Sequence, residues 1–164
     1  MTELYFHEDD QEMADIDLLV NYVAYPGHTW DIAEAQVWSP ADEKKGFIAS
    51  TIQFDDIVEY LNIALPKFDT IRTGYGNGSW LVDETIGFGI DSSFAILIEG
   101  VSDGPVERIW LIVADMEDRE IEATKYLFRF LDRFGEFLFT DNHWSFQCKT
   151  TELELFDKYC DDKF

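Results

Sequence analysis

Two short apolar runs in the middle of the chain constrain its fold more than any other feature. Residues 94–99 and 108–114 are rich in β-branched and aromatic side chains, and an Asp-Gly-Pro turn sequence lies between them. Runs of this length between turn residues predict β-strands. Because nearly every position is apolar, we expect the two strands to lie in the middle of a sheet and to be covered on both faces.

After residues 115–118 the sequence predicts a long amphipathic helix that extends to about Leu138 and covers these strands. At about 100° per residue, the apolar side chains gather on one side of the helix and the charged ones on the other. The apolar side carries Thr124, Leu127, Phe128, Leu131, Phe134 and Leu138, with Ile121, Phe130 and Phe137 at its margins. Acidic residues at the start suit the positive end of the helix dipole. We expect the regular helix to fray or bend at Gly135.

Three bases on this helix form a row, because Lys125, Arg129 and Arg133 are spaced four residues apart. Such a row could bind phosphate, but carboxylates are interleaved in the same sector. A mixed, solvated face with ion pairs along the helix is therefore the preferred interpretation.

Other segments have weaker patterns. Residues 15–24 alternate with a period of two and predict a strand. Residues 30–38 suit a returning strand or a short helix, and residues 80–82 and 85–90 are strand-like. A helix is expected over about 52–65, capped by Ser50-Thr51 and ended by Pro66. A capping box over residues 151–154 predicts a short helix that carries Leu153, Phe156 and Cys160 inward.

These elements predict an α+β fold, in which a mainly antiparallel sheet is packed against two or three helices. The 164 residues suit a single globular domain, residues 1–164. Residues 1–13 are expected to form a loosely ordered leader, partly ordered by Leu4, Tyr5 and Phe6.

The charge of the chain restricts its partners. The formal net charge is −22, yet 46% of the residues are hydrophobic and 16% aromatic, so the chain is not a disordered acidic tail. Nucleic acid and anionic membranes would be repelled, whereas a basic protein would be attracted. We find neither a transmembrane run nor a signal peptide and expect a cytoplasmic protein. In that compartment Cys148 and Cys160 are expected to be free thiols, although they could pair.

No motif for catalysis, cofactors or metals is recognised. The glycine-rich residues 74–78 lack the Gly-Lys-Ser/Thr of a phosphate loop and precede a strand-like segment, so they predict a flexible turn. The acidic residues 7–10 and 15–17 lack the pattern of a calcium loop. Cys148 and His143 form the only local nucleophile–base pair, and Cys148 equally suits a buried strand. We therefore expect no enzyme, no cofactor and no metal site.

The candidate residues are acids that could meet a basic partner and aromatic residues in less regular segments. They are Asp55, Asp56 and Glu59 on the first helix, Glu117, Asp118 and Glu120 before the long helix, and Tyr75 and Trp80. In size, charge and absence of export and catalytic motifs, the chain resembles the immunity proteins of bacterial toxin–immunity pairs. The resemblance implies inhibition of a cationic, nuclease-type toxin, and it transfers no functional residue.

Three other functions stay open at this point. Carboxylates spaced like phosphates would make the chain a nucleic-acid mimic, although the sequence cannot establish such spacing. A small enzyme would use a pocket near the glycine-rich segment. An adaptor or structural subunit would bury an aromatic patch in an oligomer, and the sequence leaves the oligomeric state open.

Overall fold

The two central apolar runs form neighbouring antiparallel strands, as predicted. Strand β6 spans Phe94–Gly100 and β7 spans Val106–Val113, with Ile96 opposite Leu111 in the ladder. Nearly every side chain of both strands is buried. The pair therefore supplies core residues to both faces of its sheet.

The computed structural model describes residues 3–7, 16–20, 52–75, 78–91, 93–135, 137–141 and 146–164. These described residues form three α-helices and nine β-strands. Besides β6 and β7, the elements are β1 (Glu3–His7), β2 (Ile16–Val20), α2 (Phe54–Ala64), β3 (Thr70–Tyr75), β4 (Gly78–Leu81), β5 (Thr85–Asp91), α3 (Asp118–Leu131), β8 (Phe137–Asp141), β9 (Phe146–Lys149) and α4 (Leu153–Lys163).

The described strands belong to two sheets. Six antiparallel strands follow the order β5-β6-β7-β2-β8-β9, and three strands follow the order β1-β3-β4. In the smaller sheet β1 runs parallel to β3, while β3 and β4 are antiparallel. The prediction of an α+β fold with a mainly antiparallel sheet and helices packed against it is confirmed.

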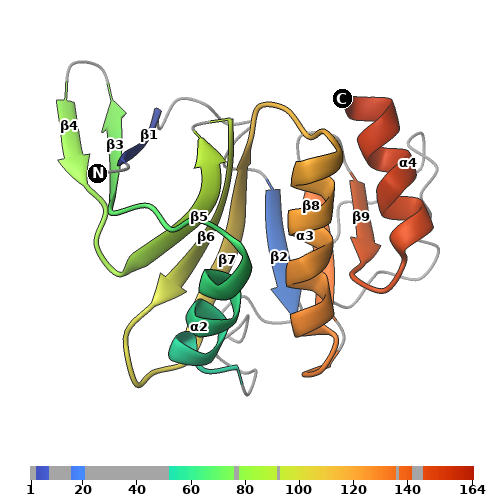
Figure 1. The fold of residues 1–164 in the computed structure, drawn as a ribbon, viewed down its shortest axis with the longest axis horizontal. Helices are drawn as coiled ribbons and strands as arrows, with labels where there is room; N and C mark the ends of the chain where they lie inside the picture. The colour runs from blue at the N-terminus through green and yellow to red at the C-terminus, as the bar shows by residue number, and fades with distance from the viewer. Residues whose placement is uncertain are drawn as a thin grey trace.

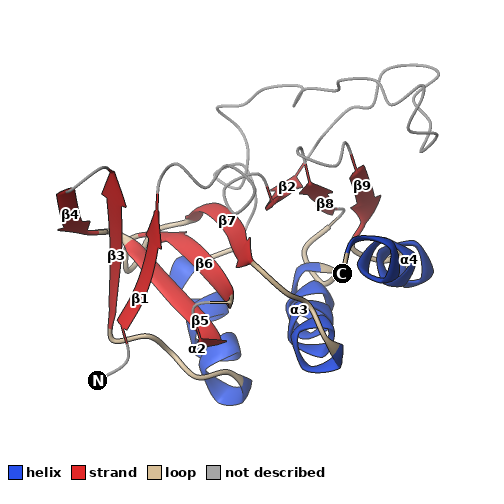
Figure 2. Ribbon diagram, turned by 90° about the horizontal axis from the view of Figure 1, so that it is seen from above, coloured by secondary structure: helices blue, strands red, loops and turns tan. Residues whose placement is uncertain are grey.

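Both faces of the central strands are covered, as expected. Helices α2, α3 and α4 lie together on one side of the large sheet (Figures 1 and 2). On that side Ile96 and Leu111 pack in one cluster with Leu61 of α2 and Phe128 of α3. On the other side, residues of β1, β3 and the segment before β3 cover the strands. That second cluster comprises Leu4, Phe68, Ile71, Ala95, Leu97, Trp110 and Ile112.

The long helix ends earlier than predicted, and the extension to Leu138 is wrong. Helix α3 stops at Leu131, a turn follows, and Gly135 has a φ of +145°, which L side chains rarely adopt. Phe137 and Leu138 lie instead on β8, which pairs with β2 and β9. Figure 1 also shows α2 across β5 and β6, and α3 over β2 and β8. The covering of the central strands is therefore shared between two helices.

The predicted helix caps are also wrong. Helix α2 has Gln53 at its N-cap, without a side-chain cap hydrogen bond. The amide of its first residue, Phe54, donates instead to the Gly104 carbonyl of the β6–β7 hairpin at 2.9 Å. Helix α4 starts after Glu152 without a capping box. Its Leu153 is 40% exposed instead of buried, whereas Phe156 and Cys160 do point into the core.

Several strand predictions are confirmed in part. Strands β2, β4 and β5 lie within or across the predicted segments 15–24, 80–82 and 85–90. The glycine-rich segment 74–78 includes the last two residues of β3 and the first residue of β4, which are antiparallel. From the predicted leader, Glu3–His7 forms β1, and Leu4 is fully buried. The strand or short helix predicted over residues 30–38 lies outside the described residues.

Candidate acidic binding face

Three of the candidate acids lie on the first two turns of α2. Asp55, Asp56 and Glu59 are exposed, while Phe54, Ile57 and Leu61 on the opposite side of the helix are buried. The helix therefore has an apolar face toward the sheet and a carboxylate face toward solvent. Acids in its first turn also favour the positive end of the helix dipole.

A hairpin brings a fourth carboxylate to this surface. The Asp55 carboxylate accepts a hydrogen bond from the Ser102 hydroxyl at 3.0 Å and one from the Asp103 amide at 2.9 Å. Asp103 has a φ of +65°, which suits the tight turn between β6 and β7, and its side chain is exposed. We call this surface the acidic face; it comprises the exposed carboxylates of Asp55, Asp56, Glu59 and Asp103.

The acidic face combines fixed geometry with uncompensated charge. The Asp55 carboxylate joins α2 to the hairpin, so the two segments that carry the four carboxylates are fixed relative to each other. Within the described part of the chain, Asp56 and Glu59 have no hydrogen-bond or ion-pair partner. Unpaired like charges on one surface create a negative potential that attracts cations and basic proteins. The acidic face can therefore attract cationic groups of a partner.

The acids before the long helix have a different task. Glu117 is the N-cap of α3 and forms a capping box with Glu120, whose carboxylate accepts the Glu117 amide at 3.1 Å. Glu120 is only 7% exposed and also pairs with Arg119 at 3.3 Å. Asp118 is exposed in the first turn. The start of α3 lies at the opposite end of the molecule from the start of α2 (Figure 1), so the structure does not join these acids to the acidic face.

The two aromatic candidates lie on the smaller sheet. Tyr75 is the last residue of β3 and Trp80 is in β4. Their backbones belong to an antiparallel pair, with Tyr75 opposite Gly78 and Thr73 opposite Trp80. Their side chains lie outside the described residues, so their role in binding stays a prediction.

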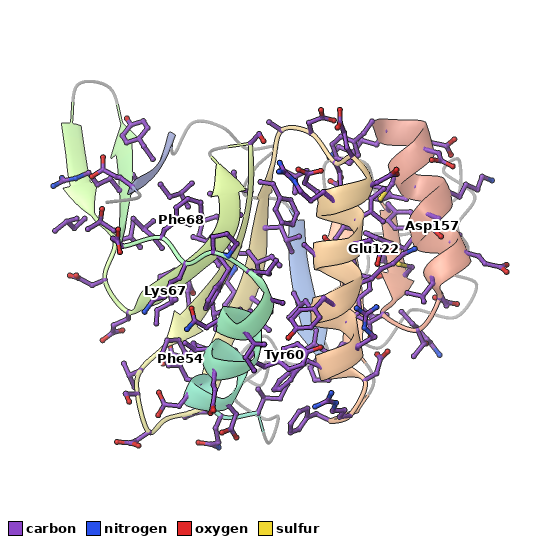
Figure 3. All side chains as sticks on the ribbon, in the orientation of Figure 1. Phe54, Tyr60, Lys67, Phe68, Glu122 and Asp157 are labelled. Atoms are coloured by element: carbon purple, nitrogen blue, oxygen red, sulfur yellow. The ribbon has the colours of Figure 1, made fainter. Side chains whose placement is uncertain are left out.

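The predicted row of bases is not one surface. Lys125 is mostly buried, and its ammonium group forms an ion pair with the carboxylate of Asp157 on α4 at 2.7 Å. Figure 3 labels Asp157. Arg129 and Arg133 lie over aromatic rings, at 5.8 Å from the Tyr126 centroid and 5.4 Å from the Tyr60 centroid. The bases therefore serve different contacts instead of forming a phosphate site.

A buried polar cluster near the C-terminus was missed by the sequence analysis. The Asp141 carboxylate accepts hydrogen bonds at 2.6 Å from the Tyr159 hydroxyl and from the Lys163 ammonium, and the Lys163 side chain is 2% exposed. Burial and the neighbouring Asp141 charge raise the pKa of Tyr159. Only the helical spacing of Tyr159 and Lys163 is visible in the sequence, and nothing there indicates Asp141 as their partner. The cluster fastens α4 to the end of β8.

The cysteines are not placed as nucleophiles. Both thiols are free and buried, Cys148 on β9 and Cys160 on α4, whereas His143 lies outside the described residues. Burial raises the pKa of the Cys148 thiol, and it raises the pKa of Cys160 to about 12, with the charges of Asp157 and Asp161 adding to the effect. A nucleophilic thiol instead needs a lowered pKa and exposure.

We therefore expect thiol labelling to report unfolding. With a disulfide reagent at pH 8, both thiols should react more than about a hundredfold more slowly in native protein than in urea, since reaction requires opening of the core. Unfolded cysteine has a pKa of about 8.5, so native protein retains protons that the unfolded chain loses above that pH. The free energy of unfolding should fall as pH rises from about 8.5 toward 12. A thiol that labels at once in native protein would contradict this placement.

Among the described residues, no group of three or more histidine, cysteine or acidic side chains is arranged to hold a metal ion. None of the described helices has the length and apolar character needed to cross a membrane.

Comparison of the chain with protein-family models, with curated proteins and with solved structures gave no significant match.

Proposed function

We propose that this protein binds a basic protein partner through the acidic face and thereby neutralises it. The observation that carries the proposal is the set of exposed carboxylates on α2 and the hairpin, which includes Asp56 and Glu59 without partners in the described part of the chain. In a free protein, such charges repel one another. A cationic partner removes that repulsion when it binds.

The arrangement favours rapid capture. Charges on a rigid surface steer a partner of opposite sign and raise the association rate constant, most strongly at low salt. The net charge of −22 adds a long-range attraction for the same class of partner. Rapid capture is what an inhibitor needs when its target is harmful from the moment it is made.

Within this class, we propose an immunity protein that inhibits a cationic, nuclease-type toxin in the cytoplasm. A toxin that acts on nucleic acid carries a basic surface for phosphates. Carboxylates on the acidic face could occupy that surface and exclude its substrate. This finer proposal is supported by the charge of the chain and by its resemblance in profile to immunity proteins.

The proposal is tested by affinity purification from a lysate of the source organism. The bait is the whole protein, elution follows a salt gradient, and bound proteins are identified by mass spectrometry. The matched control bait carries Asp56→Lys and Glu59→Lys. We expect one basic protein that elutes with salt, is absent from the control bait and loses its activity on addition of the wild-type protein. Several unrelated nucleic-acid-binding proteins would instead support mimicry, and the absence of any basic partner would refute the proposal.

A further inference from the structure

Two tyrosines, one on α2 and one on α3, pack against each other where the two helices meet. The rings of Tyr60 and Tyr126 stack at 4.3 Å with an interplanar angle of 12°. Each hydroxyl donates a hydrogen bond to the backbone carbonyl of the other tyrosine at 2.8 Å. Figure 3 shows Tyr60 between the two helices. Both hydroxyls are thus engaged, and the rings form a fixed platform.

Two arginines lie on this platform without a carboxylate partner in the described part of the chain. Arg133 lies over the Tyr60 ring and Arg129 over the Tyr126 ring, and both side chains are exposed. The other three arginines of the chain, Arg72, Arg108 and Arg119, each pair with a glutamate. Among the described residues, Arg129 and Arg133 have no such partner. In a chain with 34 acids and 12 bases, unpaired guanidinium groups need an explanation.

Apolar side chains complete the surface. Ile63 is one turn after Tyr60 on α2 and is 79% exposed, and Phe134, whose ring lies 5.0 Å from that of Phe130, is 38% exposed. We call Tyr60, Ile63, Tyr126, Arg129, Arg133 and Phe134 the seam surface. Tyrosine and arginine are enriched among the residues that dominate binding energy at protein interfaces. The seam surface adjoins the acidic face, because Glu59 and Ile63 are both exposed and lie four residues apart on α2.

We propose that the seam surface selects the partner, by accepting a segment in which a carboxylate stands beside an apolar side chain. This inference rests on the proposed function and adds the chemistry of the partner. A carboxylate can receive paired hydrogen bonds from a guanidinium group, and the apolar group can cover Ile63 or Phe134. An unbroken basic surface would instead bring like charges against Arg129 and Arg133. Selection thus combines attraction at the acidic face with repulsion of partners that lack the carboxylate.

Charge favours this occupant over a second copy of the chain. Two molecules of net charge −22 repel each other, which keeps such proteins apart. A partner that is basic overall and carries one local carboxylate is attracted by the whole molecule and satisfies the two arginines as well.

The experiment uses two short fluorescent peptides of equal net positive charge. One is uniformly lysine-rich, and the other has a central Glu-Leu pair. Anisotropy titrations at low ionic strength compare the wild-type protein with the Arg129→Gln, Arg133→Gln variant. We expect the wild type to prefer the Glu-Leu peptide by roughly threefold or more, and the variant to lose this preference and bind the lysine-rich peptide more tightly. The matched control is Arg119→Gln, an arginine paired with Glu120 at the other end of α3, which should leave the preference unchanged.

The outcomes separate this inference from the proposed function. Equal behaviour of the variant and the wild type toward both peptides would overturn selection by the seam surface and leave the acidic face intact. If the Asp56→Lys, Glu59→Lys variant bound both peptides as tightly as the wild type, the acidic face itself would be refuted. Light scattering is run in parallel, and a dimer that dissociates in the Arg129→Gln, Arg133→Gln variant would assign the surface to a second copy and overturn the inference.

Discussion

Replacing Asp56 and Glu59 by lysine is expected to slow association with the basic partner by about tenfold or more at low salt, with a smaller effect at high salt. Both side chains are exposed and have no hydrogen-bond or ion-pair partner among the described residues, so the change acts mainly on charge. Stopped-flow measurements over a range of ionic strengths test this expectation. Asp55 is left unchanged, because its carboxylate holds Ser102 and Asp103 of the hairpin and its loss would disturb the fold.

The matched control for this experiment is Asp161→Lys with Asp162→Lys. These exposed acids lie near the end of α4, across the molecule from α2 (Figure 1), and the substitution changes the net charge by the same amount. The control separates a local interface from the general attraction of the chain. If both double variants slowed association equally, only the net charge would matter, and the acidic face would not be the binding site.

Replacing Lys163 by methionine is expected to lower the free energy of unfolding by about 3–5 kcal/mol. Methionine keeps the apolar contacts beside Tyr159 and Phe164 but removes the ammonium group that lies 2.6 Å from the Asp141 carboxylate. Asp141 is fully buried, so its charge would then lack this compensation. Urea unfolding followed by tryptophan fluorescence measures the change.

Two comparisons establish the cause. Lys158→Met alters an exposed lysine on the same helix and should change stability by less than about 0.5 kcal/mol. Adding Asp141→Leu to Lys163→Met removes the buried carboxylate that has lost its Lys163 partner, and it should restore part of the loss. A Lys163→Met variant as stable as the wild type would show that the ion pair between Lys163 and Asp141 does not stabilise the C-terminal helix.

The central strands could be predicted because their sequence admits one interpretation. Consecutive apolar residues between turns, as in Phe94–Gly100, suit a strand covered on both faces, and the structure has this arrangement. The end of α3 was ambiguous, since Phe134 and Leu138 continue the helical stripe while Phe137–Asp141 also suits a strand. Pairing with β2 and β9 decides in favour of the strand, and those partners are distant in the sequence.

The candidate site could be predicted only in part, for the same reason. The exposed side of α2 follows from its helical period, which places Asp56 and Glu59 away from the core. The position of Asp103 beside Asp55 depends on packing between segments that are 48 residues apart, so no local sequence pattern predicts it. Glu120 was grouped with candidate acids by its charge, but the capping box gives it a structural role. The pairing of Asp141 with Lys163 likewise has no local signal.

The most direct test of the central claim is zero-length cross-linking of the purified complex with its basic partner. A carbodiimide joins carboxylates to lysine amines that are in contact, and mass spectrometry identifies the joined residues. We expect cross-links from partner lysines to Asp56, Glu59 or Asp103 on the acidic face. Cross-links confined to the acids of α4, with none on α2 or the hairpin, would contradict the account.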